Sequence, residues 1–309
     1  MKRWISSRTF SNRFVPNLPV RTGKLIKRQK GRSMLLGKMK PREVEEAIKR
    51  GAVVILPVGT IEQHGYHLPL DTDVAVPTYI AEKAAERTGD VVVPPVNYGY
   101  NEKDLAFIGT VSVSAETFTC YLVEICRSLA HMGFKRIMIL NGHGYNSTMV
   151  GTAGMVVIEQ TDAYCATADW WSLIADTLDE IRESEAPGGM SHACEMETSV
   201  QMVLDPEHVD MSQAVKETDF PFKGSRFVWY DMRQSPVSLK LPFHMLTRSG
   251  VIGDATVATR EKGERIVSAA VDRLVEFLEE FKRIAPVEGS KQGPMHPGRG
   301  FQVLGENPD

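Results

Sequence analysis

Residues 59–73 (GTIEQHGYHLPLDTD) are dense in side chains that bind metal ions. The segment offers, in order, Glu62, His64, His67, Asp71 and Asp73. Carboxylate and imidazole groups together suit Zn²⁺, Mn²⁺ or Fe²⁺ better than Ca²⁺. The alternative is a polar loop in which Asp71 or Asp73 caps the helix that follows. Capping accounts for one aspartate but not for Glu62 and His64 beside it, so the pattern favours a metal site.

Two later clusters add further imidazole and carboxylate groups. The second cluster, residues 141–146 (NGHGYN), places His143 in a glycine turn. The third cluster, residues 191–199 (SHACEMETS), contains His192, Glu195 and Glu197. A histidine in a glycine turn is more often structural, and Glu197 could cap the following helix. A histidine at a second strand end, near the first cluster, is better interpreted as a ligand. A histidine not needed as a ligand, such as His192, is suited to carrying protons.

Alternating strands and helices predict how these clusters are positioned. Apolar runs indicate buried strands over residues 52–58 and 91–96, and residues 136–140 and 163–168 are predicted to form two further strands. Helical spacing predicts helices over residues 42–50, 74–87, 115–132, 147–160, 197–204 and 259–284. This order predicts an α/β fold: three layers, α/β/α, with a mostly parallel sheet and helices on both faces. The first two clusters follow strands directly, at the carboxyl ends where such sheets bind ligands.

The charge distribution divides the chain. Its 309 residues contain 36 basic and 39 acidic side chains, for a net charge of −3, but residues 1–33 hold ten basic and no acidic ones. The remaining 26 basic and 39 acidic side chains give residues 34–309 a net charge of −13. Nucleic-acid binding requires a basic surface, so the acidic body argues against that partner.

Composition therefore predicts three regions. Residues 1–33 form a basic extension, residues 34–285 a single domain, and residues 286–309 a tail rich in Gly and Pro. The extension lacks the apolar run of a secretory signal. It resembles an organellar transit peptide in part, but we favour a disordered or oligomer-packing arm, with Met34 as an alternative start. Within the domain, residues 205–250 are predicted to form an irregular excursion.

The cellular location follows from what the sequence lacks. No apolar stretch approaches the roughly 18–20 residues of a membrane helix, which predicts no membrane partner. The four cysteines are few for this length and have no metal-finger spacing. Free thiols in a reducing compartment are the better interpretation, so we expect a cytoplasmic enzyme.

Three segments that supply histidine and carboxylate at sheet ends are enough for a site with two metal ions. Two bridged metal ions generate a nucleophile at neutral pH and polarise a carbonyl, which points to hydrolysis. The sequence contains no G-x-S-x-G motif, Walker loop or dinucleotide fingerprint that would support other chemistry.

Four motifs resemble the creatininase (creatinine amidohydrolase) family over about residues 41–282. They are EQHGYHLPLDTD, the NGHG turn, H-A-x-E-x-E-T-S and SGVIGD. The resemblance implies a layered α/β/α fold, a binuclear metal centre, hydrolysis of a non-peptide amide C–N bond and often a homohexamer. It implies that Glu62, His64, Asp73 and His143 bind metal, with Asp73 bridging. It also implies that His192 is the catalytic acid/base or a substrate contact, with Glu197 in the same active-site strip.

Departures from the family pattern concern the second metal and the substrate. Creatininase has a glutamate two residues after the NGH histidine, whereas this chain has Tyr145. Glu195 is predicted to replace that ligand, or the second metal binds weakly. Trp170 and Trp171 supply an aromatic wall for the substrate or belong to the core, two readings we weight equally. Asp104 lies where the family often has histidine and proline. These changes argue against creatinine and for another small amide, a formamide or a cyclic amide.

The sequence thus predicts a hydrolase with two divalent ions per subunit, Zn²⁺ and/or Mn²⁺, with Fe²⁺ also suitable. Metal-bound hydroxide attacks the amide carbonyl and His192 protonates the leaving nitrogen. Tyr145, Asp104 and the two tryptophans are the predicted substrate contacts. One alternative is hydrolysis of a lactone or phosphoester, for which Lys103 is the single base next to a motif. Others are a non-catalytic binder on the same scaffold and a nucleic-acid or membrane role for the basic arm.

Overall fold

The computed structural model describes residues 34–285. The predicted basic extension, residues 1–33, and the predicted tail, residues 286–309, lie outside the described residues. None of the described helices is long and apolar enough to cross a membrane.

A parallel sheet forms the centre of the described region. Its strands are β1 (Val54–Val58), β2 (Val91–Val92), β3 (Arg136–Asn141) and β4 (Tyr164–Asp169), in the order β2-β1-β3-β4. All three neighbouring pairs are parallel. Every residue of β1 and β3 is buried, as the apolar run over residues 52–58 predicted for β1. β2 is shorter than predicted: beyond Val92, one isolated bridge from Val96 to Val58 continues the pairing.

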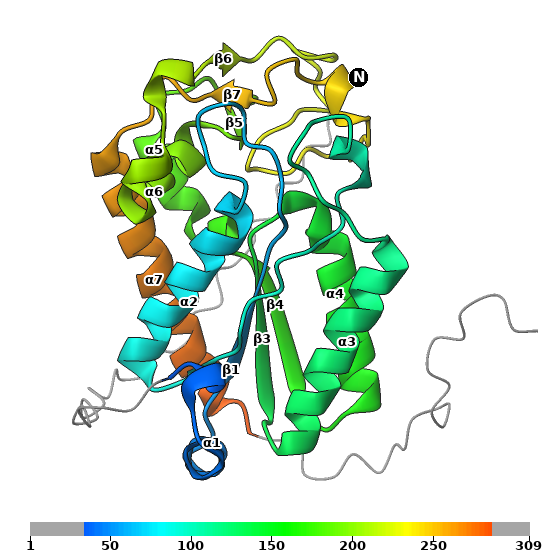
Figure 1. The fold of residues 1–309 in the computed structure, drawn as a ribbon, viewed down its shortest axis with the longest axis vertical. Coiled ribbons are helices and arrows are strands. Elements are labelled where there is room, and N and C mark those ends of the chain that lie inside the picture. Colours follow the sequence, from blue (N-terminus) through cyan, green and yellow to red (C-terminus); the bar gives the residue numbers. More distant parts are fainter. Residues whose placement is uncertain (1–33, 286–309) are drawn as a thin grey trace, which may run out of the picture. The chain divides into compact units, whose positions relative to one another are not determined.

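Helices cover both faces of this sheet (Figure 1). α3 (Ala115–Met132) and α4 (Ser147–Gln160) pack on one face, and α2 (Thr72–Thr88) and α7 (Arg260–Arg283) on the other. α1 (Pro41–Lys49) adds Ala47 to the α3–α4 side, and α6 (Glu195–Leu204) packs on α7 and α2. The predicted three-layer α/β/α fold is therefore confirmed.

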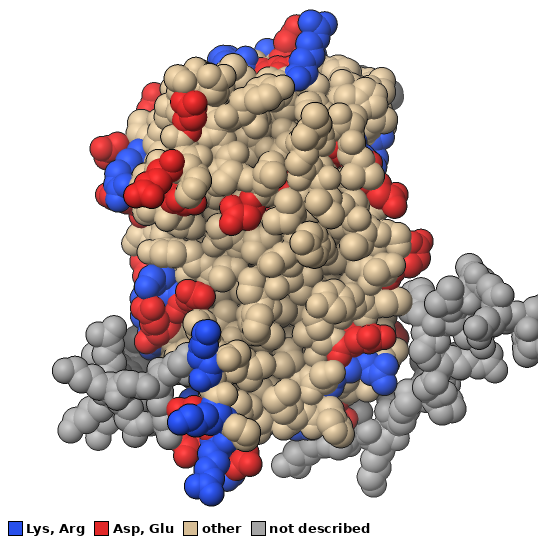
Figure 2. Space-filling view, viewed as in Figure 1, with Lys and Arg blue, Asp and Glu red and all other residues tan. Residues whose placement is uncertain are grey.

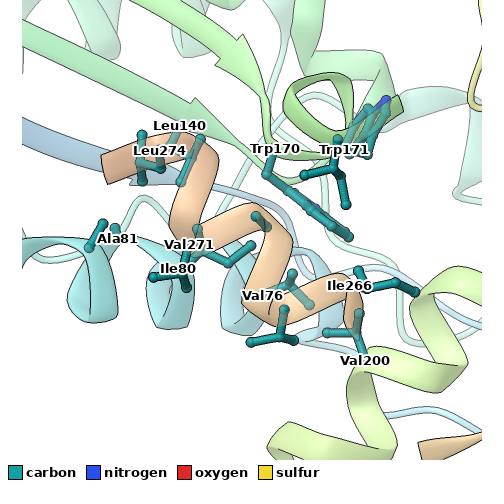
Figure 3. Packing of buried hydrophobic residues seen from close by; sticks show 14 of the residues in the cluster. Val76, Ile80, Ala81, Leu140, Trp170, Trp171, Val200, Ile266, Val271 and Leu274 are labelled. Atoms are coloured by element: carbon teal, nitrogen blue, oxygen red, sulfur yellow. The ribbon is translucent and has the colours of Figure 1, made fainter. Parts of the chain in front are cut away.

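Two apolar clusters, one on each side of the sheet, hold the layers together. On the α2–α7 side, Figure 3 shows Leu274 beside Leu140 of the sheet, with Val76 and Ile80 of α2 in the same cluster. Trp170 belongs to this cluster and is 2% exposed. A fully buried aromatic side chain contributes about 2 kcal/mol or more through removal of apolar area from water. Of the two predicted roles for Trp170, the structure therefore supports the core.

A second, smaller sheet lies beyond the carboxyl ends of the parallel strands (Figure 1). It consists of β5 (Met190–His192), β7 (Ile252–Asp254) and β6 (Lys216–Glu217), antiparallel in the order β5-β7-β6. β6 and short 3₁₀ turns are the regular structure in the predicted excursion, residues 205–250. α5 (Ala175–Ile181), β5 and β7 were not predicted.

Charged side chains of both signs share the surface. On the face shown in Figure 2, Lys and Arg of the described residues lie beside Asp and Glu. They do not form a continuous basic stripe on that face.

Candidate metal centre

Two glycines allow the first cluster to sit at the ends of β1 and β3. A Cβ atom on Gly59 would lie 2.3 Å from the backbone oxygen of Asp73, and one on Gly142 would lie 2.0 Å from the same atom. Both positions follow a strand of the parallel sheet. The absence of a side chain there lets the first turn of α2 press against the sheet edge. This contact brings Asp73, whose side chain is on the inner face of that turn, up to the carboxyl ends of the strands.

Asp73 lies between two histidines. Its Oδ1 is 3.2 Å from His64 Nε2, and its Oδ2 is 2.8 Å from His143 Nδ1. Glu62 Oε2 is 2.9 Å from the same His143 nitrogen, and Glu197 Oε2 is 4.0 Å from His64 Nε2. A carboxylate with one oxygen facing each of two histidines has the arrangement of a bridging ligand.

The donor atoms form three overlapping groups, each compact enough to hold one ion. In each group the donor atoms lie within 4.8 Å of one another. The groups are Glu62–Asp73–His143, His64–Asp73–Glu197 and Glu62–His64–His192, and every member is buried. The structure thus brings together all four predicted family ligands, together with His192 and Glu197.

Several donor atoms at this site are buried without a hydrogen-bond partner. Nε2 of His143 is such an atom; the carboxylate oxygens of Glu62, Oδ2 of Asp73 and Nε2 of His64 also make no hydrogen bond of good geometry and have only the close approaches to one another and to His143 Nδ1 described above. Buried polar atoms are normally satisfied, because leaving one unpaired costs roughly 1–3 kcal/mol. Divalent cations would satisfy them, and mixed N/O donors suit Zn²⁺ or Mn²⁺. The residues present therefore fit a binuclear metal site.

The electrostatics of the cluster also favour cations. Burial raises the pKa of Glu197 to about 7. The nearby His64 lowers this pKa, whereas the negative charges of Asp73 and Glu62 raise it further. Burial would lower the pKa of His64, but the Asp73 carboxylate reverses this and raises it to about 10. Burial likewise opposes charge on His143, yet Glu62 and Asp73 hold its pKa well above the usual value. The buried carboxylates favour positive charge on the two neighbouring histidines, and the same field attracts divalent ions.

His192 is held beside the cluster in its neutral form. Its Nε2 is 2.9 Å from the backbone oxygen of Gln63, and its ring centre is 4.3 Å from that of His64. Phe243 contacts the ring edge-on, at 4.9 Å between centroids. Burial lowers the pKa of His192 to about 4. A neutral imidazole next to a metal cluster can accept a proton.

Glu195 does not join the cluster. Its Oε1 is 2.5 Å from Lys262 Nζ, and its two oxygens accept hydrogen bonds from the backbone N–H groups of Glu183 and Ser184. Two residues on one helix differ by about 200° around the axis, so Glu195 and Glu197 in the first turn of α6 face opposite ways. The contacts of Glu195 therefore run against its prediction as the replacement ligand. Glu197, two residues on, lies beside His64 and Asp73 instead.

The predicted substrate contacts divide into two groups. Tyr145 and Trp171 line a cavity of about 430 Å³ above the metal cluster, whereas Trp170 and Asp104 are not among its lining residues. Trp170 and Trp171 both belong to the buried cluster (Figure 3), and Trp171 lines the cavity as well. Asp104 is fully buried; burial and the adjoining Glu62 raise its pKa to about 9, so it is a protonated neighbour of a donor. It lies beside Glu62 and the Gln63 side chain, so its predicted role as a substrate contact stays a prediction.

The cavity has a floor and a roof of different origin. Its floor includes Glu62, Asp73, His143, His192 and Glu197. Its roof comes from residues 228–243 of the irregular excursion, here called the roof segment, which contributes the lining residues Val228, Trp229, Tyr230, Asp231, Met232, Gln234, Ser235, Ser238, Leu239, Lys240 and Phe243. Sequence reasoning missed the roof segment because it has no periodicity and no motif.

Two residues of the first motif, Gln63 and His67, were not among the ligands that the family resemblance implied. The Gln63 side chain lies 3.2 Å from His192 Nε2 and donates to the Gly250 oxygen at 3.2 Å. His67 Nε2 is 2.9 Å from Thr198 Oγ1. They connect the first motif to the third cluster and to SGVIGD. No local pattern predicts these contacts; the presence of all three motifs in one family is the signal in the sequence that they lie together.

Comparisons with known proteins agree with this geometry. A sequence model of the family described as "Creatininase: Creatinine amidohydrolase" matches residues 37–278. Creatinine amidohydrolase of Pseudomonas putida is 28% identical over 265 residues, covering 81% of this chain and 97% of the relative. The mycofactocin precursor peptide peptidase of Mycobacterium tuberculosis is 30% identical over 240 residues, covering 72% and 82%. A crystal structure of creatinine amidohydrolase (creatininase) has a TM-score of 0.69 at 29% identity, covering 81% of this chain and 99% of that one.

The family match spans most of the described domain and includes every donor of the metal cluster. The resemblance of the four motifs is thereby confirmed. The chain belongs to the creatininase family and is a metal-dependent amidohydrolase.

Proposed function

We propose that the chain hydrolyses the C–N bond of a small amide, a formamide or a cyclic amide, with two divalent ions held by Glu62, His64, Asp73, His143 and Glu197. The observation that carries this proposal is the Asp73 carboxylate, which faces His64 with one oxygen and His143 with the other. When bound, the metal ions supply an activated water and a Lewis acid for the amide oxygen.

The chain's own residues handle the proton. With His192 Nε2 2.9 Å from the Gln63 backbone oxygen, Nε2–H donates to that oxygen and Nδ1 is left free to take up a proton. In the proposed mechanism His192 accepts the proton released as the amide is attacked and returns it to the leaving nitrogen. Phe243 packs on its ring and limits the access of bulk water. Gln63 fixes the ring in this orientation and is a positioning residue.

The cavity supports a substrate of modest size. Its volume of about 430 Å³ is at the lower end of small-molecule sites. Tyr145 and Trp171 offer flat walls for a planar amide. A further relative, from Methanobrevibacter ruminantium, is named as the deformylase of a formylaminopyrimidine monophosphate and is 26% identical over 165 residues. Its name supports a formamide as one candidate for this chain.

Metal removal and a substrate panel test the proposal. Chelation is expected to abolish turnover of at least one formamide, cyclic amide or urea, and Zn²⁺ or Mn²⁺ to restore it. His64→Ala should lose bound metal in elemental analysis and lower kcat/KM at least ~100-fold, because it removes one donor from two of the three groups. His208→Ala is the matched control, since His208 is exposed and outside the cluster. Full turnover by chelated enzyme would exclude the mechanism.

We also propose that the protein assembles as a homohexamer in the cytoplasm. Two segments, residues 61–70 and 105–111, lie next to each other, because the Val111 N–H donates to the Ile61 oxygen and a Cβ on Gly109 would touch Leu70. Both segments expose apolar side chains. The exposed residues are Tyr66, Leu70, Leu105, Ile108 and Val111. Such a patch is typical of an interface. The four cysteines are free, as in a reducing compartment. Light scattering should give about six times the 34.4 kDa chain mass, and less for Ile108→Asp.

A further inference from the structure

Two lysines converge on one aromatic ring beside the metal cluster. Lys103 Nζ is 5.3 Å and Lys240 Nζ is 5.8 Å from the centre of the Tyr145 ring. The two lysines come from separate segments, since Lys103 precedes α3 and Lys240 belongs to the roof segment. Tyr145 and Lys240 both line the cavity. An ammonium group within about 6 Å of a ring centre is held there by a cation–π interaction.

These ammonium groups are not neutralised by the protein. Neither lysine has an ion pair with an acidic group anywhere in residues 34–285. The acids that line the cavity have other partners. Asp231 pairs with Arg182, and Asp169 accepts hydrogen bonds from Ser147 and Asn141. The remaining three, Glu62, Asp73 and Glu197, belong to the metal cluster.

Two like charges over one ring oppose each other. Partial burial lowers the pKa of Lys103, and the neighbouring Lys240 lowers it further. Such a pair is unfavourable without a counter-ion, because each positive charge raises the free energy of the other. An anion that binds between the two ammonium groups removes this penalty and gains charge-assisted hydrogen bonds from both.

The Tyr145 ring also sets the distance from this pair to the metal cluster. Its centre is 5.6 Å from the centre of the His143 ring, with the rings edge to face. A carboxylate at position 145, as creatininase has, would pair with the two lysines and cancel their charge. The tyrosine holds both ammonium groups without cancelling them. Both ammonium groups therefore lie about one ring's width beyond His143, and of the two lysines Lys240 lines the cavity while Lys103 approaches from the other side of the lining.

We propose that Lys103 and Lys240 form a subsite for an anionic group of the substrate, a carboxylate or a phosphate. This inference rests on the proposed function. The substrate class that fits is a small amide whose scissile carbonyl lies over the metal cluster and whose anionic group is a few bonds away. A neutral amide such as a simple formamide leaves the two charges unmatched and is a poorer substrate.

Matched substrate pairs test the subsite in the metal-loaded, full-length enzyme. One pair is N-formylglycine and its neutral amide, N-formylglycinamide. The other is N-formyl-O-phosphoethanolamine and N-formylethanolamine, so the two pairs distinguish carboxylate from phosphate. The wild type is expected to favour at least one anionic member by ~10-fold or more in kcat/KM. Lys103→Ala and Lys240→Ala should each raise KM for that member ~10-fold and leave the neutral member unchanged.

Two further variants separate charge from packing. Lys240→Arg keeps the charge and should retain most of the preference, whereas Lys240→Glu should reverse it in favour of the neutral member. Lys223→Ala is the matched control, because Lys223 lies in the same excursion but pairs with Glu185 and does not line the cavity. Both lysines of the subsite project from loops, so their replacement leaves the two apolar clusters intact.

The outcomes distinguish failure of the subsite from failure of the proposed function. Hydrolysis of neutral and anionic members with equal kcat/KM, unchanged in the lysine variants, overturns the subsite and leaves the amidohydrolase standing. If no member is hydrolysed, calorimetric titration with N-formylglycine and inorganic phosphate decides: weaker binding by Lys103→Ala and Lys240→Ala supports the subsite, and unchanged binding overturns it. Unchanged binding in these variants would mean that the anions bind the metal ions alone.

Discussion

Replacing Lys262 by methionine should destabilise the protein without removing metal. Lys262 Nζ is 2.5 Å from Glu195 Oε1, and the two residues are 8% and 1% exposed. Methionine fills a similar volume but has no charge, so the Glu195 carboxylate stays buried without its cation. The variant also removes the pair of Lys262 with Glu183 and its hydrogen bond to the Val257 oxygen, so the double variant described below is needed to isolate the Glu195 pair.

The expected loss is about 3 kcal/mol in the free energy of unfolding. Removing one member of a buried ion pair costs roughly 3–5 kcal/mol. The lower end applies because the Glu183 and Ser184 N–H groups still donate to Glu195, at 2.9 and 3.0 Å. With a urea slope of about 3 kcal/mol/M for a chain of this size, the midpoint should fall by about 1 M. The double variant Glu195→Gln/Lys262→Met should recover most of this loss, because it leaves no unpaired buried charge.

Urea titration followed by circular dichroism, in the presence of a chelator, measures these midpoints without a contribution from metal binding. Elemental analysis of the metal-loaded proteins completes the test, and the metal content should be equal in wild type, Lys262→Met and Glu195→Gln. A midpoint shift below about 0.3 M for Lys262→Met would refute the buried pair. Loss of one metal ion in Glu195→Gln would show that Glu195 is a ligand after all and would refute the assignment of its contacts.

Three further predictions follow from the same geometry. Gly142→Ala should lower the free energy of unfolding by about 1–3 kcal/mol and weaken metal binding, because the added Cβ would lie 2.0 Å from the Asp73 backbone oxygen. Gly144→Ala is the control for urea unfolding and for metal content, because a Cβ there meets nothing within 4 Å. Trp170→Ala and Trp171→Ala should each cost about 3–5 kcal/mol in urea unfolding, because both side chains belong to the same buried cluster; Trp171→Ala alone should also raise KM, because Trp171 lines the cavity, and an equal rise in KM for Trp170→Ala would contradict this division. Burial would raise the pKa of Glu217, but hydrogen bonds from Ser249, Arg248 N–H and Thr247 lower it overall. The stabilisation from Glu217 is therefore complete above the unfolded-state pKa of about 4.3 and is lost as pH falls through the lower folded value. Glu217→Gln should be less stable than wild type at pH 7 by about 1 kcal/mol, and a difference that persists undiminished at pH 2 would contradict the assignment.

Helices with local start and stop signals could be predicted closely from the sequence. The helix predicted over residues 115–132 has those bounds, because Ser114 accepts a hydrogen bond from the Thr117 N–H and Gly133 adopts a left-handed φ of 117°. The parallel strands were also predictable, since burial on both faces produces uninterrupted apolar runs. Helix caps and apolar runs are features of short segments, so they can be read from one sequence.

The parts that failed depend on contacts between distant segments. The helix predicted from residue 197 begins at Glu195. Glu195 and Glu197 therefore both lie in its first turn, where they face opposite sides of the helix and only Glu197 faces the metal cluster. The pairing of Met190–His192 with Ile252–Asp254 joins segments about 60 residues apart, which no local pattern announces. The contact of Asp104 with Glu62 and Gln63 likewise joins segments about 40 residues apart.

The separate origins of the cavity floor and the roof segment have a consequence for how substrate preference evolves. The metal donors sit on a rigid sheet edge fixed by glycine contacts, whereas residues 228–243 carry almost no regular structure and few backbone constraints. Substitutions, insertions and deletions in the roof segment can therefore accumulate without disturbing the ions beneath. Relatives of this chain are named for creatinine, for a precursor peptide and for 3-dehydro-scyllo-inosose. The roof segment therefore offers a place to alter substrate choice, provided that Phe243, which packs on His192, and Asp231, which pairs with Arg182, are kept.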